Sequence, residues 1–337
     1  MTLISYPTRV HFADDVLQEA LHSELERAGS KAPLLVSESV LIGSEFADRV
    51  LEGLPGSAMP QTLNLAPHAD LSQCVKSAMG QLSQPDVIIA FGSARAIEFG
   101  RKCRYALKQK YGDRPQFYAV PGLDGLPGPC TRNVENWRAG LPTVLICDPT
   151  VTLDADPEQC WLAAVLSLVR CIESYLGAAY NPPADGMALD ALSRCVVTLP
   201  KCASKPRLDL HREVMAAGLN AALSQEKGVG PSLVLAAALA EPKLGLKVPE
   251  LARLILPAVI QNGSVNAEKA TVLLKVLGGP EQALDAAVKR ILDPVPMGRS
   301  LSELGIGRDD LDRVSTQVNG KAGLTSEGAR AVLETIY

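Results

Sequence analysis

Short apolar segments alternate with amphipathic segments in the first part of this chain, and the alternation ends near residue 147. The apolar segments are typical of buried strands, and the amphipathic ones repeat their apolar residues at helical spacing. The expected strands are 8–12, 33–37, 62–65, 86–91, 116–120 and 143–147, and the expected helices are 15–28, 44–54, 71–82 and 94–109. Strands that alternate with helices in this way form a parallel sheet covered on both faces. We therefore predict a Rossmann-like α/β domain of nucleotide-binding type, although such a fold does not by itself establish a function.

The second part of the chain has helical periodicity and almost no strand signal. The expected helices are 158–176, 184–199, 208–223, 231–240, 248–261, 266–277, 280–292, 308–318 and 326–337. This change of pattern after Asp148-Pro149 predicts two domains: an α/β domain of dinucleotide-binding type over residues 1–154 and an all-α domain over residues 155–337. The cleft between two such domains is the default place for a site.

The composition of the 337-residue chain is that of a globular protein. Apolar residues make up 47%, the formal net charge is −4, and no excess of Lys and Arg marks a nucleic-acid surface. No apolar run approaches the roughly 20 residues that cross a bilayer. The first residues also lack a basic segment followed by a long apolar one. We expect a cytoplasmic protein that binds a small molecule and neither nucleic acid nor a membrane.

Eight cysteines are spread along the chain without a C-x-x-C pair or zinc-ribbon spacing. This pattern predicts free thiols in a reducing compartment. Cys130 differs from the others only because it lies in a Gly/Pro-rich loop near the proposed cleft. The four histidines are far apart in sequence, so a histidine-rich metal site is excluded by the inventory.

Several motifs occur in the same order as in a known family. They are P-x-x-V-x-F at 7–12, the strand and turn at 86–93, A-V-P at 119–121, D-P-x-x-T at 148–152, Glu173 with Asn181-Pro182 and Asp185, and L-x-E-L-G-I at 301–306. Together they resemble the iron-containing alcohol dehydrogenase and glycerol dehydrogenase superfamily, which has a dehydroquinate synthase-like fold. The resemblance extends over nearly the whole chain and is strongest to the maleylacetate reductases. It implies a two-domain fold, an NAD(P) cofactor and a homodimer formed through the edge strand of the first domain.

The resemblance places the cofactor at the turn after the fourth strand. Where the family has three glycines, this chain has Ala90-Phe91-Gly92, followed by Ser93 and Ala94. Backbone N–H groups of such a turn, together with the N-terminus of the next helix, bind a pyrophosphate. The loss of two glycines weakens this phosphate cradle without removing it.

Three other positions belong to the implied cofactor groove. Pro121 precedes two threonines in the family, and here those threonines are replaced by Gly122 and Leu123. Glu38 follows the second expected strand, where a carboxylate can accept hydrogen bonds from the ribose hydroxyls. If Glu38 points into the groove, it favours NAD over NADP because it repels the 2′-phosphate. The alternative interpretation is a solvated loop glutamate.

The metal ligands of the family fall on residues that cannot bind a metal. Two of them belong to the helical pattern G-x-D-A-x-x-H-x-x-E, and alignment of Glu173 with its last position puts Leu166 and Arg170 at the ligand positions. The third and fourth ligands fall on Leu233 and Val248. None of these side chains can ligate Fe²⁺ or Zn²⁺. The resemblance therefore implies a family fold without its metal, as in the maleylacetate reductases, although those relatives keep imidazoles at these positions.

The interpretation we favour is a metal-independent NAD(P)-dependent oxidoreductase that transfers a hydride to or from a small carbonyl or alcohol substrate. Arg170 would then supply the positive charge that polarises the carbonyl oxygen, or would hold a substrate carboxylate. Alternatively, Arg170 pairs with Glu173 or Asp148, or extends to the surface.

Two other functions remain open from the sequence. The first is a catalytically inactive binding or scaffold protein on the same fold, which would explain why the cradle, the threonines and the metal ligands have all changed. The second is a ligand other than a dinucleotide, held in a pocket lined by Gly92, Ser93, Gly122 and Asp124. Binding of NAD or NADP distinguishes the enzyme from both.

Overall fold

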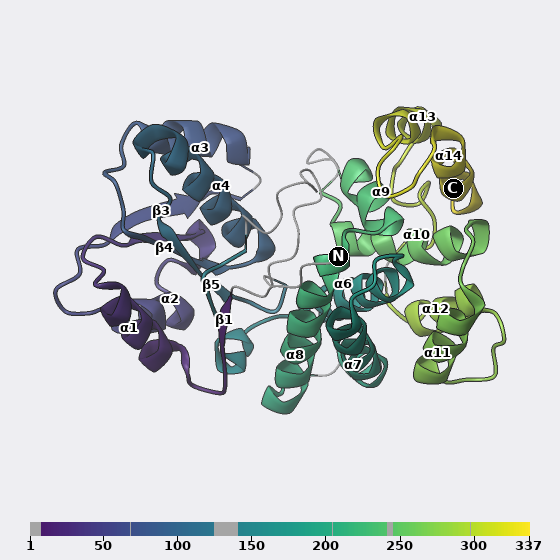
Figure 1. Ribbon diagram of the computed structural model, residues 1–337, viewed down its shortest axis with the longest axis horizontal. Helices are drawn as coiled ribbons and strands as arrows, with labels where there is room; N and C mark the ends of the chain where they lie inside the picture. The colour runs from purple at the N-terminus through teal and green to yellow at the C-terminus, as the bar shows by residue number, and fades with distance from the viewer. Residues whose placement is uncertain (1–7, 68, 125–140, 204, 241–244, 297) are drawn as a thin grey trace.

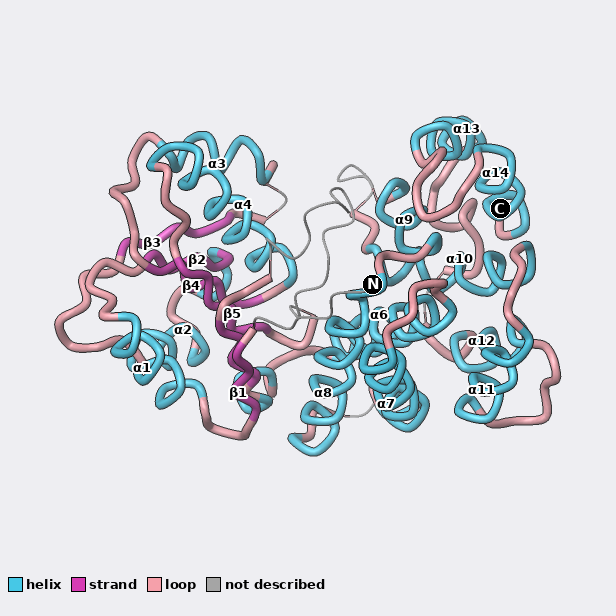
Figure 2. Tube along the Cα trace, in the orientation of Figure 1, coloured by secondary structure: helices cyan, strands magenta, loops and turns pink. Residues whose placement is uncertain are grey.

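The computed structural model describes residues 8–67, 69–124, 141–203, 205–240, 245–296 and 298–337. A parallel sheet with its covering helices forms one half of the molecule, and a group of helices forms the other (Figures 1 and 2). Within the described ranges, every element from residue 157 onward is helical. The predicted fold class, a Rossmann-like parallel-sheet domain followed by helices, is confirmed.

Six parallel strands form the sheet, in the order β1-β6-β5-β4-β2-β3. They are β1 (Arg9–Phe12), β2 (Leu34–Glu38), β3 (Gln61–Leu65), β4 (Val87–Gly92), β5 (Gln116–Pro121) and β6 (Val144–Cys147). The register pairs Ala90 of β4 with Val36 on one side and with Ala119 on the other, and it pairs Gly92 with Pro121. The C-terminal ends of β2, β4 and β5 therefore meet at one edge of the sheet, where ligands bind in open α/β folds.

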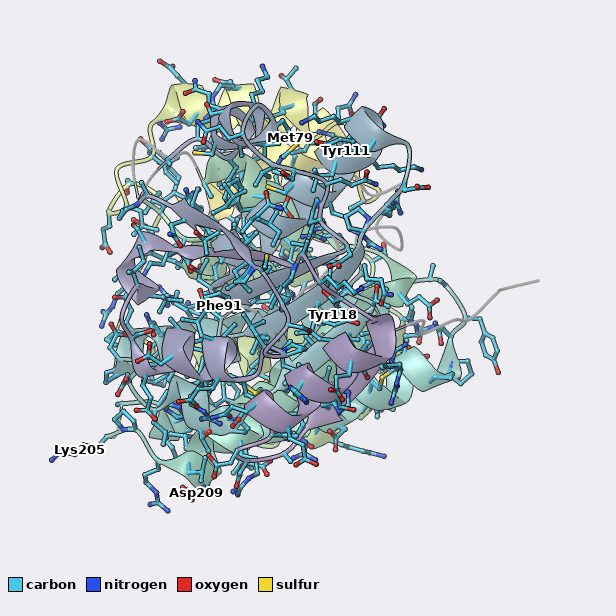
Figure 3. The ribbon with its side chains drawn as sticks, turned by 90° about the vertical axis from the view of Figure 1, so that its left-hand side faces the viewer. Met79, Phe91, Tyr111, Tyr118, Lys205 and Asp209 are labelled. Atoms are coloured by element: carbon cyan, nitrogen blue, oxygen red, sulfur yellow. The ribbon has the colours of Figure 1, made fainter. Side chains whose placement is uncertain are left out.

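Helices cover both faces of the sheet because alternate strand residues point to opposite sides. Leu35 and Ile89 pack with α1 (Leu17–Ala28) and α2 (Glu45–Glu52), whereas Ile88 packs with α3 (Leu71–Met79) and α4 (Ala94–Tyr111). Phe91 and Tyr118, labelled in Figure 3, belong to the face covered by α1 and α2. The hydroxyl of Tyr118 donates a hydrogen bond of 3.1 Å to a carbonyl oxygen of α1.

The helical half is organised around α6 (Pro157–Leu176), which is buried along most of its length and packs on several neighbours. A helix that is apolar on all sides is buried in this way. The other helices are α7 (Pro182–Thr198), α8 (Leu208–Ser224), α9 (Pro231–Leu239), α10 (Val248–Asn262), α11 (Ala267–Leu277), α12 (Leu284–Leu292), α13 (Arg308–Gln317) and α14 (Ser326–Thr335). In the part of the chain that the structure describes, no helix is long and apolar enough to cross a membrane.

The expected helices are confirmed to within about one turn, and α12 differs the most. It begins at Leu284, whereas the sequence pattern predicts a start at Pro280. Gly278 and Gly279 have positive φ values of 62° and 100°, so the chain leaves α11 in a direction that does not lead into a helix. The carboxylate of Glu281 then pairs with Arg290 of α12 at 2.8 Å.

A buried carboxylate organises the end of β6. Oδ1 of Asp148 accepts hydrogen bonds from the N–H groups of Asp15 at 3.1 Å and Thr150 at 3.0 Å. Oδ2 accepts from the N–H of Leu17 at 3.1 Å and from Nη2 of Arg49 at 2.8 Å. Helix α1 has no side-chain cap from its own N-cap residue. Asp148 therefore caps α1 from another strand and ties α2 to the same point.

Helix α8 joins the two halves of the molecule. Met215 packs into the core between the sheet and helices α3 and α4. Nδ1 of His211 lies 3.0 Å from Oγ1 of Thr152, and burial lowers the pKa of this imidazole. Nε of Arg212 donates a hydrogen bond of 3.1 Å to Asp14, next to the sheet. These contacts set the position of the helical half relative to the C-terminal edge of the sheet.

Candidate functional site

The turn between β4 and α4, which the sequence predicts as a phosphate cradle, leads directly from the strand into the helix. Gly92 ends the strand with φ of 110°, a conformation that favours glycine. Ser93 is the N-cap of α4, and its hydroxyl oxygen accepts the N–H of Arg95 at 3.1 Å. Helix α4 lies close to the sheet, because a Cβ atom at Gly100 would come within 2.6 Å of the Ala90 side chain. The turn is thus placed where β4 meets its neighbours, with the N-terminus of α4 directly above it.

Glu38 lies against this turn. It ends β2, the neighbour of β4 in the sheet, and it is half-buried. Its Oε2 atom accepts a hydrogen bond of 3.3 Å from the N–H of Ser93, and its Oε1 atom accepts a second one from the Ser93 hydroxyl. Of the two interpretations offered by the sequence, the structure supports the one in which Glu38 points toward the turn. No pattern in the sequence indicates that Glu38 contacts Ser93.

The end of β5 forms the other wall of the turn. Pro121 is buried opposite Gly92, and the N–H of Gly122 donates a hydrogen bond of 2.8 Å to the carbonyl oxygen of Gly92. Leu123 is 4% exposed and belongs to the hydrophobic core of the helical half. Its side chain therefore packs with apolar side chains of the helical half.

Asp124 adds a second carboxylate at the same place. Burial and then the negative charge of Glu38 raise the pKa of Asp124 to about 6, against the opposing influence of Lys247 and the N–H of Ala94. Lys247 is the N-cap residue of α10, so a charged residue of the helical half also acts on Asp124. The site that the sequence predicted as a phosphate cradle is therefore lined by two carboxylates of the chain itself.

Arg170 is half-buried and lies within the last two turns of α6. Burial and the positive charge of Arg101 on α4 lower the pKa of Arg170 to about 10, which still leaves it charged at neutral pH. The two acids named as alternative partners are engaged elsewhere: Asp148 with Arg49, and Glu173 with the start of α9. Arg170 also lies close to Arg101 of the sheet half, which is itself ion-paired with Glu98.

The remaining positions aligned with metal ligands are apolar and belong to one core. Leu233 is buried, and Leu166 and Val248 are partly buried against the same hydrophobic cluster. They come from α6, α9 and α10, which pack on one another. Within the described ranges, no group of three or more His, Cys, Asp or Glu side chains is placed to hold a metal ion. The donor set at these positions does not fit a metal.

Glu173 has a structural role that the sequence did not reveal. It is buried, and its Oε1 atom accepts a hydrogen bond of 2.5 Å from the N–H of Ser232 in the first turn of α9. Burial raises the pKa of Glu173 to about 7, against the opposing hydrogen bonds from Ser232 and from the N–H of Leu233. A Cβ atom at Gly230 would lie 2.3 Å from Cδ of Glu173. In the sequence, only the G-V-G-P-S segment at 228–232 suggests a close approach of another residue to the start of α9.

Three polar side chains of the helical half, Tyr175, Tyr180 and Lys227, could donate a proton. Nζ of Lys227 lies 3.4 Å from the carbonyl oxygen of Tyr175. Tyr180 is 79% exposed, and Nζ of Lys227 is ion-paired with Asp185 at 2.6 Å. Tyr175 lies beneath the ammonium group of Lys269, with 5.7 Å between Nζ and the ring centroid. Cys130 lies outside the described residues. The structure gives none of these side chains the role of a general acid.

With this geometry the chain has the fold of the iron-containing alcohol dehydrogenases, and the resemblance seen in the sequence is confirmed. The 1,3-propanediol oxidoreductase structure superposes with a TM-score of 0.83 at 17% identity, covering 97% of each chain. Maleylacetate reductase from Agrobacterium tumefaciens gives 0.78 at 17% identity, covering 100% of this chain and 97% of that one. Sulfoacetaldehyde reductase from Bifidobacterium kashiwanohense, in complex with NAD⁺, gives 0.82 at 15% identity, covering 100% and 99%.

One relative is similar in sequence over most of its length. The 4-hydroxybutyrate dehydrogenase of Cupriavidus necator is 25% identical over 362 residues, which span 93% of this chain and 92% of the relative. No protein-family model matches the chain. The relatives similar in sequence or fold are dehydrogenases and reductases, so the comparisons support an oxidoreductase.

Proposed function

We propose that this protein is an NAD(P)-dependent oxidoreductase that works without a bound metal and transfers a hydride to or from a small carbonyl or alcohol substrate. The observation that carries the proposal is the turn at residues 92–94, with φ of 110° at Gly92 and the start of α4 at Ala94. It stands at the C-terminal edge of the sheet, in a fold shared over almost the whole chain with dehydrogenases and reductases. The proposal includes the division into a dinucleotide-binding domain (1–154) and an all-α domain (155–337).

The residues around the turn would hold the cofactor, which supplies or accepts the hydride when bound. The N–H groups of Ser93 and Ala94, at the N-terminus of α4, would bind its pyrophosphate. Pro121 and the backbone of Gly122 and Leu123 would border it from β5. This is the same set of residues as in the sequence-based prediction, with the Leu123 side chain buried in the core of the helical half.

Glu38 stands at the end of β2, within reach of the same groove. A carboxylate at this place accepts hydrogen bonds from ribose hydroxyls and repels a 2′-phosphate, so we propose NAD as the preferred cofactor. A homodimer through the edge of the sheet is also part of the proposal, because β1 is an edge strand with Val10 38% exposed.

Arg170 is the side chain that we propose for charge stabilisation in place of the metal. A permanent cation can stabilise negative charge on the carbonyl oxygen, and a guanidinium can also bind a carboxylate through two parallel hydrogen bonds. The charge of Arg101, which is itself paired with Glu98, lowers the pKa of Arg170, so an anionic group of a substrate beside Arg170 would be favoured electrostatically. The similarity to a 4-hydroxybutyrate dehydrogenase supports a substrate that carries a carboxylate. We therefore propose small hydroxy acids and the corresponding aldehyde acids as the substrate class.

The test is a steady-state assay with NAD⁺ and a panel of small hydroxy acids, on the wild-type protein and on Arg170 variants. We expect Arg170→Ala to lower kcat/KM by roughly 100-fold, the size of effect seen when one oxyanion donor is removed. Arg170→Lys keeps the charge but loses the two-point geometry, so it should recover part of the loss. Arg194→Ala is the control because it removes another arginine, which pairs with Asp190 on α7 and with Glu213 on α8. Equal activity of Arg170→Ala and the control would rule out this role for Arg170.

One observation favours a second candidate, an inactive binding protein on the same fold. The donors of the cradle are engaged by the carboxylates of Glu38 and Asp124. If calorimetry finds no binding of NAD⁺, NADH or NADP⁺, and the assay finds no turnover, the second candidate replaces the oxidoreductase.

A further inference from the structure

The donors of the phosphate cradle already have an anionic acceptor. A phosphate at a helix N-terminus accepts hydrogen bonds from the first free N–H groups and from the N-cap hydroxyl. Here the carboxylate of Glu38 takes both groups of Ser93, its N–H at 3.3 Å and its hydroxyl. The N–H of Arg95 is bonded to the Ser93 hydroxyl oxygen, and the N–H of Gly122 to a carbonyl oxygen. Glu38 thus occupies the place that a phosphate oxygen would take.

Gly92, the glycine that the turn retains, is required by the position of the Glu38 carboxylate. A Cβ atom at position 92 would lie 2.5 Å from Oε2 of Glu38 and 2.8 Å from Leu41, both inside van der Waals contact. The positions that lack the family's other glycines are Ala90 and Phe91, which are buried in the cores on opposite faces of the sheet. Glycine at 92 is therefore explained by its positive φ and by the approach of Glu38, without reference to a ligand.

The charges around the turn also oppose an anion. Glu38 approaches from β2 and Asp124 from the end of β5, while Lys247 from α10 acts in the opposite direction on Asp124. Lys247 is at the same time paired with Glu158 at 2.8 Å, which reduces its influence. A pyrophosphate that enters this turn must displace one carboxylate from its hydrogen bonds and tolerate a second one nearby.

We propose that Glu38 acts as an internal competitor for the phosphate-binding turn: it occupies the Ser93 donors when no cofactor is bound and must turn away before a pyrophosphate group can bind. The inference rests on the proposed function, because it concerns the affinity of the same cofactor site. The competition makes dinucleotide binding weaker than the backbone geometry alone would allow. One side chain on β2, Glu38, then controls how tightly the turn binds a pyrophosphate group.

The experiment compares binding of inorganic pyrophosphate and of NAD⁺ by calorimetry to the wild-type protein, to Glu38→Gln and to Glu38→Ala. Pyrophosphate has no ribose, so it reports on the turn without any contact between Glu38 and the sugar. We expect both variants to bind pyrophosphate about tenfold more tightly than the wild type, because one nearby like charge is removed. Glu45→Gln, which removes an exposed carboxylate from α2, is the control and should stay within about twofold of the wild type. The variants' melting curves establish that they are folded.

The outcomes separate the inference from the proposed function. If the Glu38 variants gain affinity for pyrophosphate and no variant binds a dinucleotide, the competitor role holds and the oxidoreductase proposal fails. If the wild type binds NAD⁺ and the Glu38 variants bind pyrophosphate no better than it does, the competitor role is wrong while the oxidoreductase proposal stands. Absence of pyrophosphate binding in all of the proteins also overturns the inference, because the turn is then not a phosphate site.

Asp124 lies beside the turn, because a Cβ atom at Gly122 would be 3.5 Å from the carbonyl oxygen of Gly92 and 3.9 Å from Oδ1 of Asp124, and this carboxylate predicts a pH dependence of the site. Its pKa of about 6 means that it is largely neutral at about pH 5.5 and negative at about pH 8, whereas the bridging phosphates of NAD⁺ remain charged throughout. Binding of an anion is favoured when Asp124 is protonated, so the affinity of the wild type for NAD⁺ should rise several-fold as the pH falls between these values. Calorimetry at both values measures this, and Asp124→Asn should remove most of the change. A dependence that is unchanged in Asp124→Asn would assign the titration to another group.

Discussion

Replacement of Asp148 with alanine is expected to lower the free energy of unfolding by about 3–5 kcal/mol, the range for breaking a buried ion pair from one side. The Asp148 side chain is 0% exposed and Arg49 only 10%, so the variant leaves a guanidinium charge buried without this carboxylate. The N–H groups of Asp15 and Leu17 lose their acceptor as well, and with them α1 loses its cap. The sheet half should therefore unfold at a markedly lower denaturant concentration.

Urea unfolding followed by circular dichroism measures the effect of the Asp148 substitution. The matched control is Asp312→Ala, which removes the acid of another Asp–Arg pair, 2.7 Å from Arg330 but 70% exposed. Loss of this exposed pair should lower the free energy of unfolding by less than about 1 kcal/mol. A second substitution, Arg49→Met, should restore part of the stability of Asp148→Ala, because it removes the uncompensated charge. Equal costs for Asp148→Ala and Asp312→Ala would contradict the assignment of Asp148 as the organising group.

Gly230→Ala is the second substitution with a large expected effect, about 2–4 kcal/mol of destabilisation from overpacking and a lost charged hydrogen bond. The new Cβ atom would overlap Cδ of Glu173 at 2.3 Å, so the carboxylate must leave the first turn of α9. The backbone of Gly230 has φ of −82° and ψ of 170°, which any residue can adopt. The cost therefore arises from the contact and not from backbone strain.

The control for Gly230→Ala is Gly186→Ala in α7, where a Cβ atom meets nothing within 4 Å. Alanine there should leave the protein unchanged or slightly more stable, because glycine lowers helix stability. The double variant Glu173→Gly/Gly230→Ala should be little less stable than Glu173→Gly alone, because glycine at 173 removes every Glu173 atom that a Cβ at 230 would overlap, including the Glu173 Cβ at 2.6 Å. If the two substitutions are instead fully additive, Glu173 is not the group that requires glycine at 230.

These two predictions bear on function because they concern the frame of the proposed site. Asp148 fixes the end of β6 and the start of α1 on the sheet side. Glu173 joins α6, which carries Arg170, to the first turn of α9. A loss of activity in either variant must therefore be compared with its loss of stability before it is assigned to the chemistry.

The order of strands and helices could be predicted from the sequence because each element carries its own periodic pattern. The strand 87–92 is a run of buried apolar residues, and α6 begins with the cap Asp156 and a proline. Family motifs then placed Gly92, Ser93 and Glu38 near the cofactor groove and Arg170 near the former metal site. Those assignments needed only the order of the residues and the resemblance.

What only the tertiary structure decided are the partners of the buried and half-buried carboxylates. Glu38 bonds to Ser93, 55 residues away, Glu173 to Ser232, 59 residues away, and Asp148 to Leu17, 131 residues away. Such contacts depend on which strands are neighbours in the sheet and on how closely α6 approaches α9, and neither leaves a periodic signal in the sequence. The raised pKa of Asp124 depends on the same packing, because burial and a neighbouring charge exist only in the folded chain. The sequence by itself thus determined the elements and their order, and the packing of those elements decided the charges at the site.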